Sequence, residues 1–156
     1  KEARKLAKEQ GISKKPLLVK ISPDLSWQKL DEQLQICLEQ RIDGFIAVNT
    51  TTSRENLKTK TTEMGGLSGP PLFRRAIQVV KHISQYTEGK VPIIGVGGIS
   101  NWEQAKTMIK AGASLIQILT AFVREDPFIA RKINKGAVRE MERKGINNLS
   151  TLKPKW

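Results

Sequence analysis

Four apolar runs recur along the chain, and polar or glycine residues follow each of them. The runs cover residues 17–22 (LLVKIS), 45–50 (FIAVNT), 91–96 (VPIIGV) and 115–120 (LIQILT). Apolar character that continues along a run, rather than alternating, is typical of a parallel strand covered on both faces. The pattern therefore predicts four buried parallel strands.

Amphipathic segments lie between and around these runs, with apolar residues every three or four positions, as on one face of a helix. The predicted helices are residues 1–10, a helix after Ser26, residues 71–86, residues 101–111 and a helix after Asp126-Pro127. Ser100 and Glu103 have the spacing of a capping box and are expected to start the helix over 101–111.

Strict alternation of strand and helix predicts parallel pairing and right-handed connections. Four such units make half of a (β/α)8 barrel. Barrels of this kind hold phosphate groups after strands 7 and 8, and two glycines follow the third run at once. We therefore expect an α/β fold in which residues 1–156 form a single domain, the carboxyl-terminal half of a (β/α)8 barrel with four parallel βα units.

The two glycines, Gly97 and Gly98, are the first candidate for chemistry. Without a Cβ atom, such residues turn the chain sharply and let backbone N–H groups approach a phosphate. In the segment over 53–71, Ser68 and Gly69 offer a hydroxyl among exposed N–H groups, a second grip on an anionic ligand. Spacing alone also allows blander interpretations, a tight βα turn for the first pair and a flexible loop tip for the second.

Polar residues at the ends of the first two runs add to this site. Lys20 is unexpected in a buried strand, because burying an ammonium is costly unless it reaches an anion or a cavity. We interpret it as facing a ligand, and a lysine extending from the rim into solvent is the alternative. Asn49 and Thr50 follow the second run and supply donors and acceptors for a flat polar ligand.

The only cysteine and the only histidine are not assigned chemistry. Cys37 falls on an inward stripe with Leu30, Leu34 and Leu38, so we interpret it as a packed core thiol. His82 falls off the inward stripe of its helix and is expected at the surface. No metal site is expected.

The net charge of +12 lies mostly at the two ends of the chain. Residues 1–20 hold seven Lys and Arg against two Glu, and residues 124–156 hold nine against four acidic residues. A solvated basic surface is the favoured interpretation over a membrane or nucleic-acid surface, and no nucleic-acid partner is expected because no recognition signature accompanies the charge. No run of 18 apolar residues and no signal sequence is present, so no membrane-spanning segment is expected.

Five motifs, in this order and spacing, closely resemble the carboxyl-terminal half of class 2 dihydroorotate dehydrogenase, the FMN enzyme of pyrimidine biosynthesis. They are LLVKISPDL, GFIAVNTTTSR, GGLSGPPL, VPIIGVGGI and GASLIQILTAF, and the resemblance runs from Pro16 to the end of the chain. The NTT and GGLSGxPL pair favours this family over dihydrouridine synthases and similar flavin barrels.

The resemblance implies a role for each matching residue. Lys20 matches the lysine beside the flavin N1 and O2 edge, and Asn49 and Thr50 match residues that bind the pyrimidine substrate. Leu119 stands where the family commonly has tyrosine, so only a backbone contact is expected there. The residues implied to bind the cofactor are Lys20, Val48, Asn49, Ser68, Gly69, Gly97, Gly98, Leu119 and Thr120. Among them, Gly97 and Gly98 form the phosphate cradle with the backbone of Leu119 and Thr120.

The implied activity is oxidation of dihydroorotate to orotate, with FMN as cofactor and quinone as acceptor. The general base, a serine in class 2, belongs to the amino-terminal half of the barrel, so no catalytic residue is assigned here and the chain alone is expected to be inactive. The alternative is a non-catalytic half-barrel that binds FMN or another phosphorylated ligand, and a weaker one is a basic interaction module.

Half a barrel leaves two strand edges and an apolar face without partners. We therefore expect a second chain that completes the barrel, or a homodimer. The resemblance implies a cytoplasmic protein or one peripheral to the inner membrane.

Overall fold

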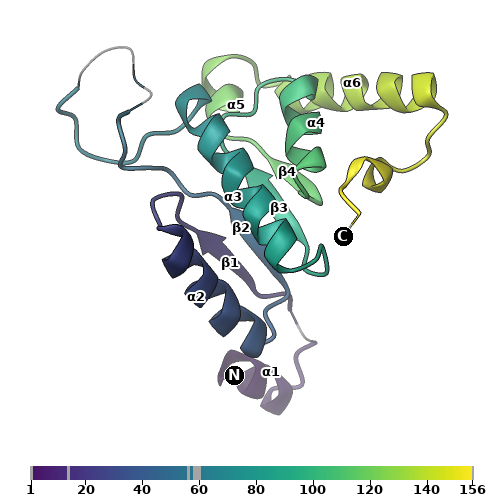
Figure 1. The fold of residues 1–156 in the computed structure, drawn as a ribbon. Coiled ribbons are helices and arrows are strands. Elements are labelled where there is room, and N and C mark those ends of the chain that lie inside the picture. The colour runs from purple at the N-terminus through teal and green to yellow at the C-terminus, as the bar shows by residue number, and fades with distance from the viewer. Residues whose placement is uncertain (1, 14, 56, 58–60, 156) are drawn as a thin grey trace.

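A computed structural model describes residues 2–13, 15–55, 57 and 61–155, and in this part of the chain four parallel strands form one sheet (Figure 1). The strands are β1 (Leu18–Ile21), β2 (Gly44–Ala47), β3 (Ile93–Val96) and β4 (Leu115–Gln117). They pair in chain order, β1-β2-β3-β4, with every neighbouring pair parallel. The predicted partial barrel of four parallel βα units is therefore confirmed.

Helices follow each strand, and those that pack on the sheet cover a single face of it (Figure 1). The helices are α1 (Glu2–Glu9), α2 (Trp27–Glu39), α3 (Phe73–Tyr86), α4 (Trp102–Lys110), α5 (Thr120–Arg124) and α6 (Ile129–Lys144), with 3-10 turns η1 (Pro70–Leu72) and η2 (Leu149–Leu152). The helices α2, α3 and α4 lie on the same side of the strands, and α6 packs against α4.

Burial alternates along the strands, so that one face belongs to the core and the other is open. Ile21, Phe45 and Ala47 are fully buried against the helices. Lys20 lies on the other face, and Leu115, in the edge strand β4, is 63% exposed. The apolar runs indicated strands covered on both faces, and within this chain the helices cover one of them; the other is the face that half a barrel was expected to leave without partners.

Helix α4 begins one residue later than expected. Asn101, not Ser100, is its N-cap, and the Asn101 side chain accepts a hydrogen bond from the N–H of Gln104 at 2.9 Å. The Gln104 side chain in turn accepts from the N–H of Ser100 at 2.8 Å. Asn101 is thus the N-cap, because asparagine is at least as good a cap as serine, and Gln104 reaches back to Ser100 instead of completing a capping box with the N–H of Asn101.

Two other boundaries differ from those expected. The fourth strand ends at Gln117, and the residues from Thr120 form α5, which the apolar run concealed. Asp126 caps a turn by accepting from the N–H of Phe128 at 2.7 Å, and α6 starts only at Ile129.

Two side chains lie elsewhere than their stripes predicted. Leu38 is 36% exposed, so the buried stripe of α2 is Leu30, Leu34 and Cys37. The His82 side chain is only 28% exposed, because it stacks on Trp27 with ring centroids 4.7 Å apart and its Nε2 lies 2.5 Å from Asp31 Oδ1.

Glu140 joins α6 to α4 through a carboxylate that is 7% exposed. Its Oε2 accepts from Trp102 Nε1 at 3.3 Å and from Lys106 Nζ at 3.2 Å, and its Oε1 lies 3.0 Å from Lys144 Nζ. The hydrogen bonds from Lys144 and Lys106 lower the pKa of Glu140 to about 2. The charged form is therefore the one that holds the two helices together.

Replacing Glu140 by Gln should lower the free energy of unfolding near neutral pH, because the half-buried Lys106 and the exposed Lys144 lose the buried anion that they share. The folded pKa of about 2 lies below the ordinary value of 4.5. This contribution is consequently complete above the ordinary pKa and lost as pH falls through the folded one. Urea unfolding at neutral pH and near pH 3 should show a smaller difference between wild type and E140Q at acid pH.

Glu103→Gln is the matched control, because Glu103 also contacts Lys106, at 2.8 Å, but is 71% exposed. E103Q should change stability little. An E140Q effect that is the same at both pH values would contradict the assignment.

Candidate functional site

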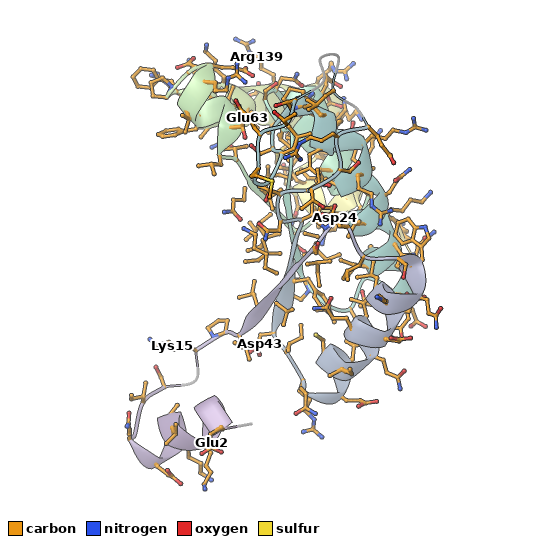
Figure 2. All side chains as sticks on the ribbon, turned by 90° about the vertical axis from the view of Figure 1, so that its left-hand side faces the viewer. Glu2, Lys15, Asp24, Asp43, Glu63 and Arg139 are labelled. Carbon is orange, nitrogen blue, oxygen red and sulfur yellow. The ribbon has the colours of Figure 1, made fainter. Side chains whose placement is uncertain are left out.

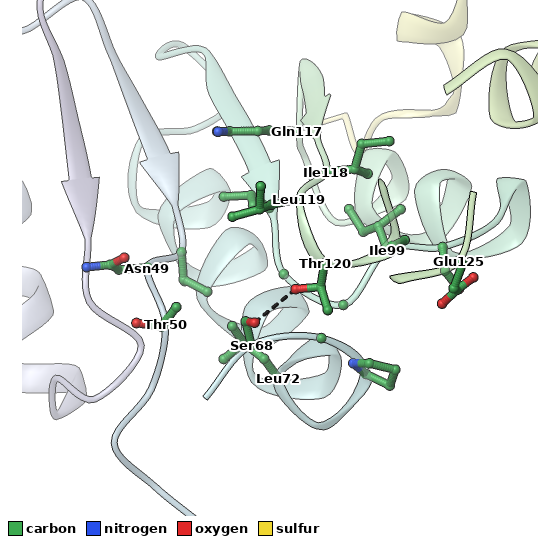
Figure 3. Close-up of a pocket in the computed structure, with 18 of the residues that line it drawn as sticks. Asn49, Thr50, Ser68, Leu72, Ile99, Gln117, Ile118, Leu119, Thr120 and Glu125 are labelled. Carbon is green, nitrogen blue, oxygen red and sulfur yellow. Dashed lines mark hydrogen bonds between the residues drawn. The ribbon is translucent and has the colours of Figure 1, made fainter. Parts of the chain in front are cut away.

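The carboxyl ends of the four strands and the loops that follow them enclose one cavity, with about 720 Å³ of space that includes a part open to solvent (Figure 3). All the residues proposed for the site from the sequence line this cavity: Lys20, Val48, Asn49, Thr50, Ser68, Gly69, Gly97, Gly98, Leu119 and Thr120. Their proximity follows from the parallel sheet, whereas their roles stay predictions.

The bend at Gly97 and Gly98 follows β3 and can be made only by glycine. Their φ angles are +133° and +69°, and a Cβ on Gly98 would lie 2.7 Å from the carbonyl oxygen of Gly69 and 2.8 Å from the Cβ of Phe73. Among the described residues, no hydrogen bond takes the N–H of Gly97 or Gly98. The bend is thus tightly packed behind and keeps two backbone donors for a ligand.

Ser68 and Thr120 join two loops at one end of the cavity. Thr120 Oγ1 donates to Ser68 Oγ at 2.9 Å (Figure 3). A Cβ on Gly69 would lie 3.1 Å from Thr120 Cγ2, so the two segments touch closely. The loop after β2 and the start of α5 therefore form a continuous wall, although 52 residues separate the two hydroxyls.

The segment after β2 is held between its neighbours by its backbone. Val48 donates its N–H to the carbonyl of Val96 at 2.9 Å, and Asn49 donates to that of Ile21 at 2.8 Å. Val48 is 2% exposed and lines the cavity together with Asn49, whose side chain Figure 3 labels. The end of the strand thus presents a polar amide beside a buried apolar side chain.

Lys20 lies where it was expected, but for a different reason. It lines the cavity from the open face of β1, beside Ile46 of β2 in the register of the sheet. Its side chain is exposed, so the argument from the cost of burial was wrong. An exposed ammonium at the edge of a polar cavity is free to meet an anionic or polar ligand.

Three polar residues of the cavity, Ser100, Gln117 and Glu125, were not proposed for it from the sequence. Gln117 lines it from the open face of β4. It shares that face with Leu115, two residues earlier in the strand, and this spacing could have indicated that its amide faces the cavity. Glu125 lines it from the end of α5. No pattern in the sequence indicates that position, because it depends on the short helix that turns the chain back toward the cavity.

Cys37 and His82 take no part in the cavity, as predicted. Cys37 lies on the buried face of α2. Burial raises the pKa of its thiol, which disfavours the reactive thiolate. His82 is paired with Asp31 between α2 and α3. Among the described residues, no group of three or more His, Cys, Asp or Glu is arranged to hold a metal ion.

A family model described as dihydroorotate dehydrogenase matches residues 2–141. The chain belongs to the dihydroorotate dehydrogenase family. It is 45% identical over 135 residues to a dihydroorotate dehydrogenase (quinone) of Gloeobacter violaceus, an alignment that covers 86% of this chain and 38% of that protein. A protein of the same name from Thermus thermophilus is 42% identical over 153 residues, with 95% of this chain and 43% of that protein covered.

A solved structure of ligand-free dihydroorotate dehydrogenase from Eimeria tenella superposes with a TM-score of 0.81 at 35% identity, covering 87% of this chain and 38% of that one. The chain therefore spans about two fifths of the length of the relatives that it matches. In the part of the chain that is described, no helix has the length and apolar character needed to cross a bilayer.

Gly98→Ala should lower the free energy of unfolding by roughly 2–5 kcal/mol, because a left-handed φ costs about 1–2 kcal/mol and overpacking a further 1–3. Gly145→Ala is the control: its φ is +62°, but no atom of the described residues lies within 4 Å of its Cβ position. G145A should therefore lower the free energy of unfolding only by the roughly 1–2 kcal/mol that a left-handed φ costs. Thermal or urea unfolding measures both, and equal losses would contradict the crowding at the bend.

Proposed function

We propose that this chain is the FMN-holding half of a quinone-dependent dihydroorotate dehydrogenase, a single half-barrel domain over residues 1–156. The observation that carries the proposal is the convergence of the ten matching residues on one cavity at the carboxyl edge of the sheet. Ligands of such barrels bind at this edge. When bound, FMN supplies the two-electron acceptor for oxidation of dihydroorotate to orotate.

The phosphate end of the site is the bend at Gly97 and Gly98 together with the backbone of Leu119 and Thr120. A Cβ at Gly98 would fill the space between the bend and the loop at Gly69, and the bend leaves two N–H donors unused among the described residues. Such successive N–H groups bind anions. The cavity therefore fits a phosphate group by shape and by donor chemistry.

The ring end is formed by Lys20, Val48 and the pair Ser68 and Gly69. The Lys20 ammonium donates hydrogen bonds and favours negative charge on a ring beside it. Val48, buried at the floor, excludes water from one edge. The Asn49 amide and the Thr50 hydroxyl orient the pyrimidine substrate through donors and acceptors that suit its carbonyl and N–H groups.

No residue of this chain is assigned as the general base that takes the C5 proton. In class 2 enzymes this is a serine outside the matched motifs, so the barrel must be completed before dihydroorotate can be oxidised. The open face supports this requirement, because Leu115 and Leu119 are 63% and 65% exposed. The half that completes the barrel, whether it belongs to a longer form of this polypeptide, to a second chain or to a second copy, supplies the base in this proposal, and the complete protein would be cytoplasmic or peripheral to the inner membrane.

The second candidate function is a non-catalytic half-barrel that binds FMN or another phosphorylated ligand. The observation that favours it is the pair of N–H donors at Gly97 and Gly98 that no described residue uses, because they suit the phosphate of any phosphorylated ligand. Both functions use the same cavity and differ only in turnover.

Flavin binding tests what the two functions share. The chain should bind FMN with quenched flavin fluorescence, and Lys20→Gln should weaken the affinity about tenfold, or about 1.4 kcal/mol, because a charge-assisted hydrogen bond is lost. Lys29→Gln, at an exposed position of α2, is the matched control and should leave affinity unchanged. Absence of flavin binding by the wild-type chain would exclude both functions.

Turnover separates the two functions. The chain with FMN, dihydroorotate and a quinone should form no orotate, and adding an amino-terminal half from a relative should restore orotate formation, which absorbance follows directly. Steady turnover by the chain alone would contradict the missing base. Failure to gain activity from any such half, with flavin bound, would favour the non-catalytic function.

A further inference from the structure

We propose that Asp24 is a positioning residue that fixes two loops of the connection between β2 and η1, residues 48–54 and 65–69, in the form that lines the cavity. Its carboxylate lies outside the cavity and acts through Thr51 and Thr52 on Asn49, Thr50 and Ser68. The consequence for a ligand rests on the proposed function, whereas the effect on the loops does not.

Asp24 follows β1 and lies at the carboxyl edge of the sheet, whereas Asp43 lies at the opposite edge (Figure 2). Its Oδ2 accepts from the Thr52 N–H at 2.8 Å and from Thr52 Oγ1 at 2.9 Å. Its Oδ1 accepts a short hydrogen bond from Thr51 Oγ1. Three donors from two consecutive residues therefore tie the loop after β1 to the segment that follows Asn49 and Thr50.

Thr51 passes this restraint on to the glycine-rich loop. Thr51 and Leu67 form an isolated antiparallel bridge, with the Thr51 N–H donating to the Leu67 carbonyl at 3.0 Å and the reverse bond at 2.7 Å. Leu67 directly precedes Ser68. Arg54 strengthens the same joint by donating to the carbonyls of Thr52 at 3.0 Å and Gly65 at 2.6 Å.

Arg75 of α3 holds Asp24 in place from the other side. Its guanidinium donates to the carbonyls of Pro23 and Leu25, both at 2.8 Å, and so brackets Asp24 along the chain. The guanidinium also lies 4.2 Å from the centre of the Trp27 ring. The backbone on both sides of Asp24 is therefore held by Arg75, and this positions the Asp24 carboxylate for the donors of Thr51 and Thr52.

The charge of Asp24 is also maintained. Partial burial raises the pKa of Asp24, but the hydrogen bonds from Thr51 and Thr52 and the charge of Arg75 outweigh it, so the pKa lies below its ordinary value. The carboxylate is thus fully ionised near neutral pH. An amide at this position could accept through one oxygen only, and its NH2 group would face the donors of Thr51 or Thr52.

Asp24→Asn tests the restraint in the full chain without any ligand. Protection of the Thr51 and Leu67 N–H groups against hydrogen exchange should fall about tenfold, because both depend on the bridge that Asp24 anchors. Asp31→Asn, on α2, is the matched control, since it removes a carboxylate that pairs with His82 and not with the loops. Its Thr51 and Leu67 protection should equal that of wild type.

Ligand binding then separates positioning from a general structural role. The dissociation constant of FMN should rise about tenfold in D24N, because the flavin ring needs the loops after β2. Inorganic phosphate should compete with FMN only at the bend of Gly97 and Gly98. Its inhibition constant for FMN binding should therefore be the same in D24N and in wild type. This split between two ligands is not expected of a variant that is merely less folded.

Unchanged Thr51 and Leu67 protection in D24N would overturn the inference. Equal weakening of FMN and phosphate, or loss of protection throughout the sheet, would also overturn it in favour of a general structural role. A wild-type chain that binds no flavin would overturn the proposed function only, and the exchange result would still decide the role of Asp24.

Discussion

Parallel pairing of the four strands is the constraint on which the site depends. Because every strand points the same way, each of the loops that follow β1, β2, β3 and β4 starts at one edge of the sheet. Residues as far apart in the chain as Lys20 and Thr120 can then line one cavity. The helices that bury Phe45, Ile21 and Ala47 on a single face supply the stability that holds this edge in shape.

The same edge explains why so much of the site was predictable. Apolar runs mark the strands, and the first polar or glycine residues after them must lie at the edge, whatever the details of packing. Asn49, Gly97 and Gly98 follow from this rule alone. The glycines carry extra information, since a left-handed φ and a neighbour 2.7 Å from the Cβ position of Gly98 leave no alternative residue.

Features that depend on tertiary contacts were not predictable in the same way. The run over 115–120 looks like one strand, but it ends at Gln117 and its last residue starts α5, which brings Glu125 to the cavity. The half-buried state of His82 depends on Trp27 and Asp31 of another helix. The sequence does not indicate the proposed positioning role of Asp24, because a Pro-Asp pair after a strand is an ordinary turn signal.

The division of the sheet into a packed face and an open face links the fold to its completion. On the packed face, large apolar residues meet helices of the same chain, so this half can hold its strands together by itself. On the open face, Lys20 and Gln117 are polar, while Leu115, at the amino end of β4, is apolar and exposed. A cover that suits both must provide apolar contact toward the amino ends of the strands and a polar or ligand-filled space toward the carboxyl edge. The interior of a (β/α)8 barrel has this gradient, filled with side chains below and lined by loops above.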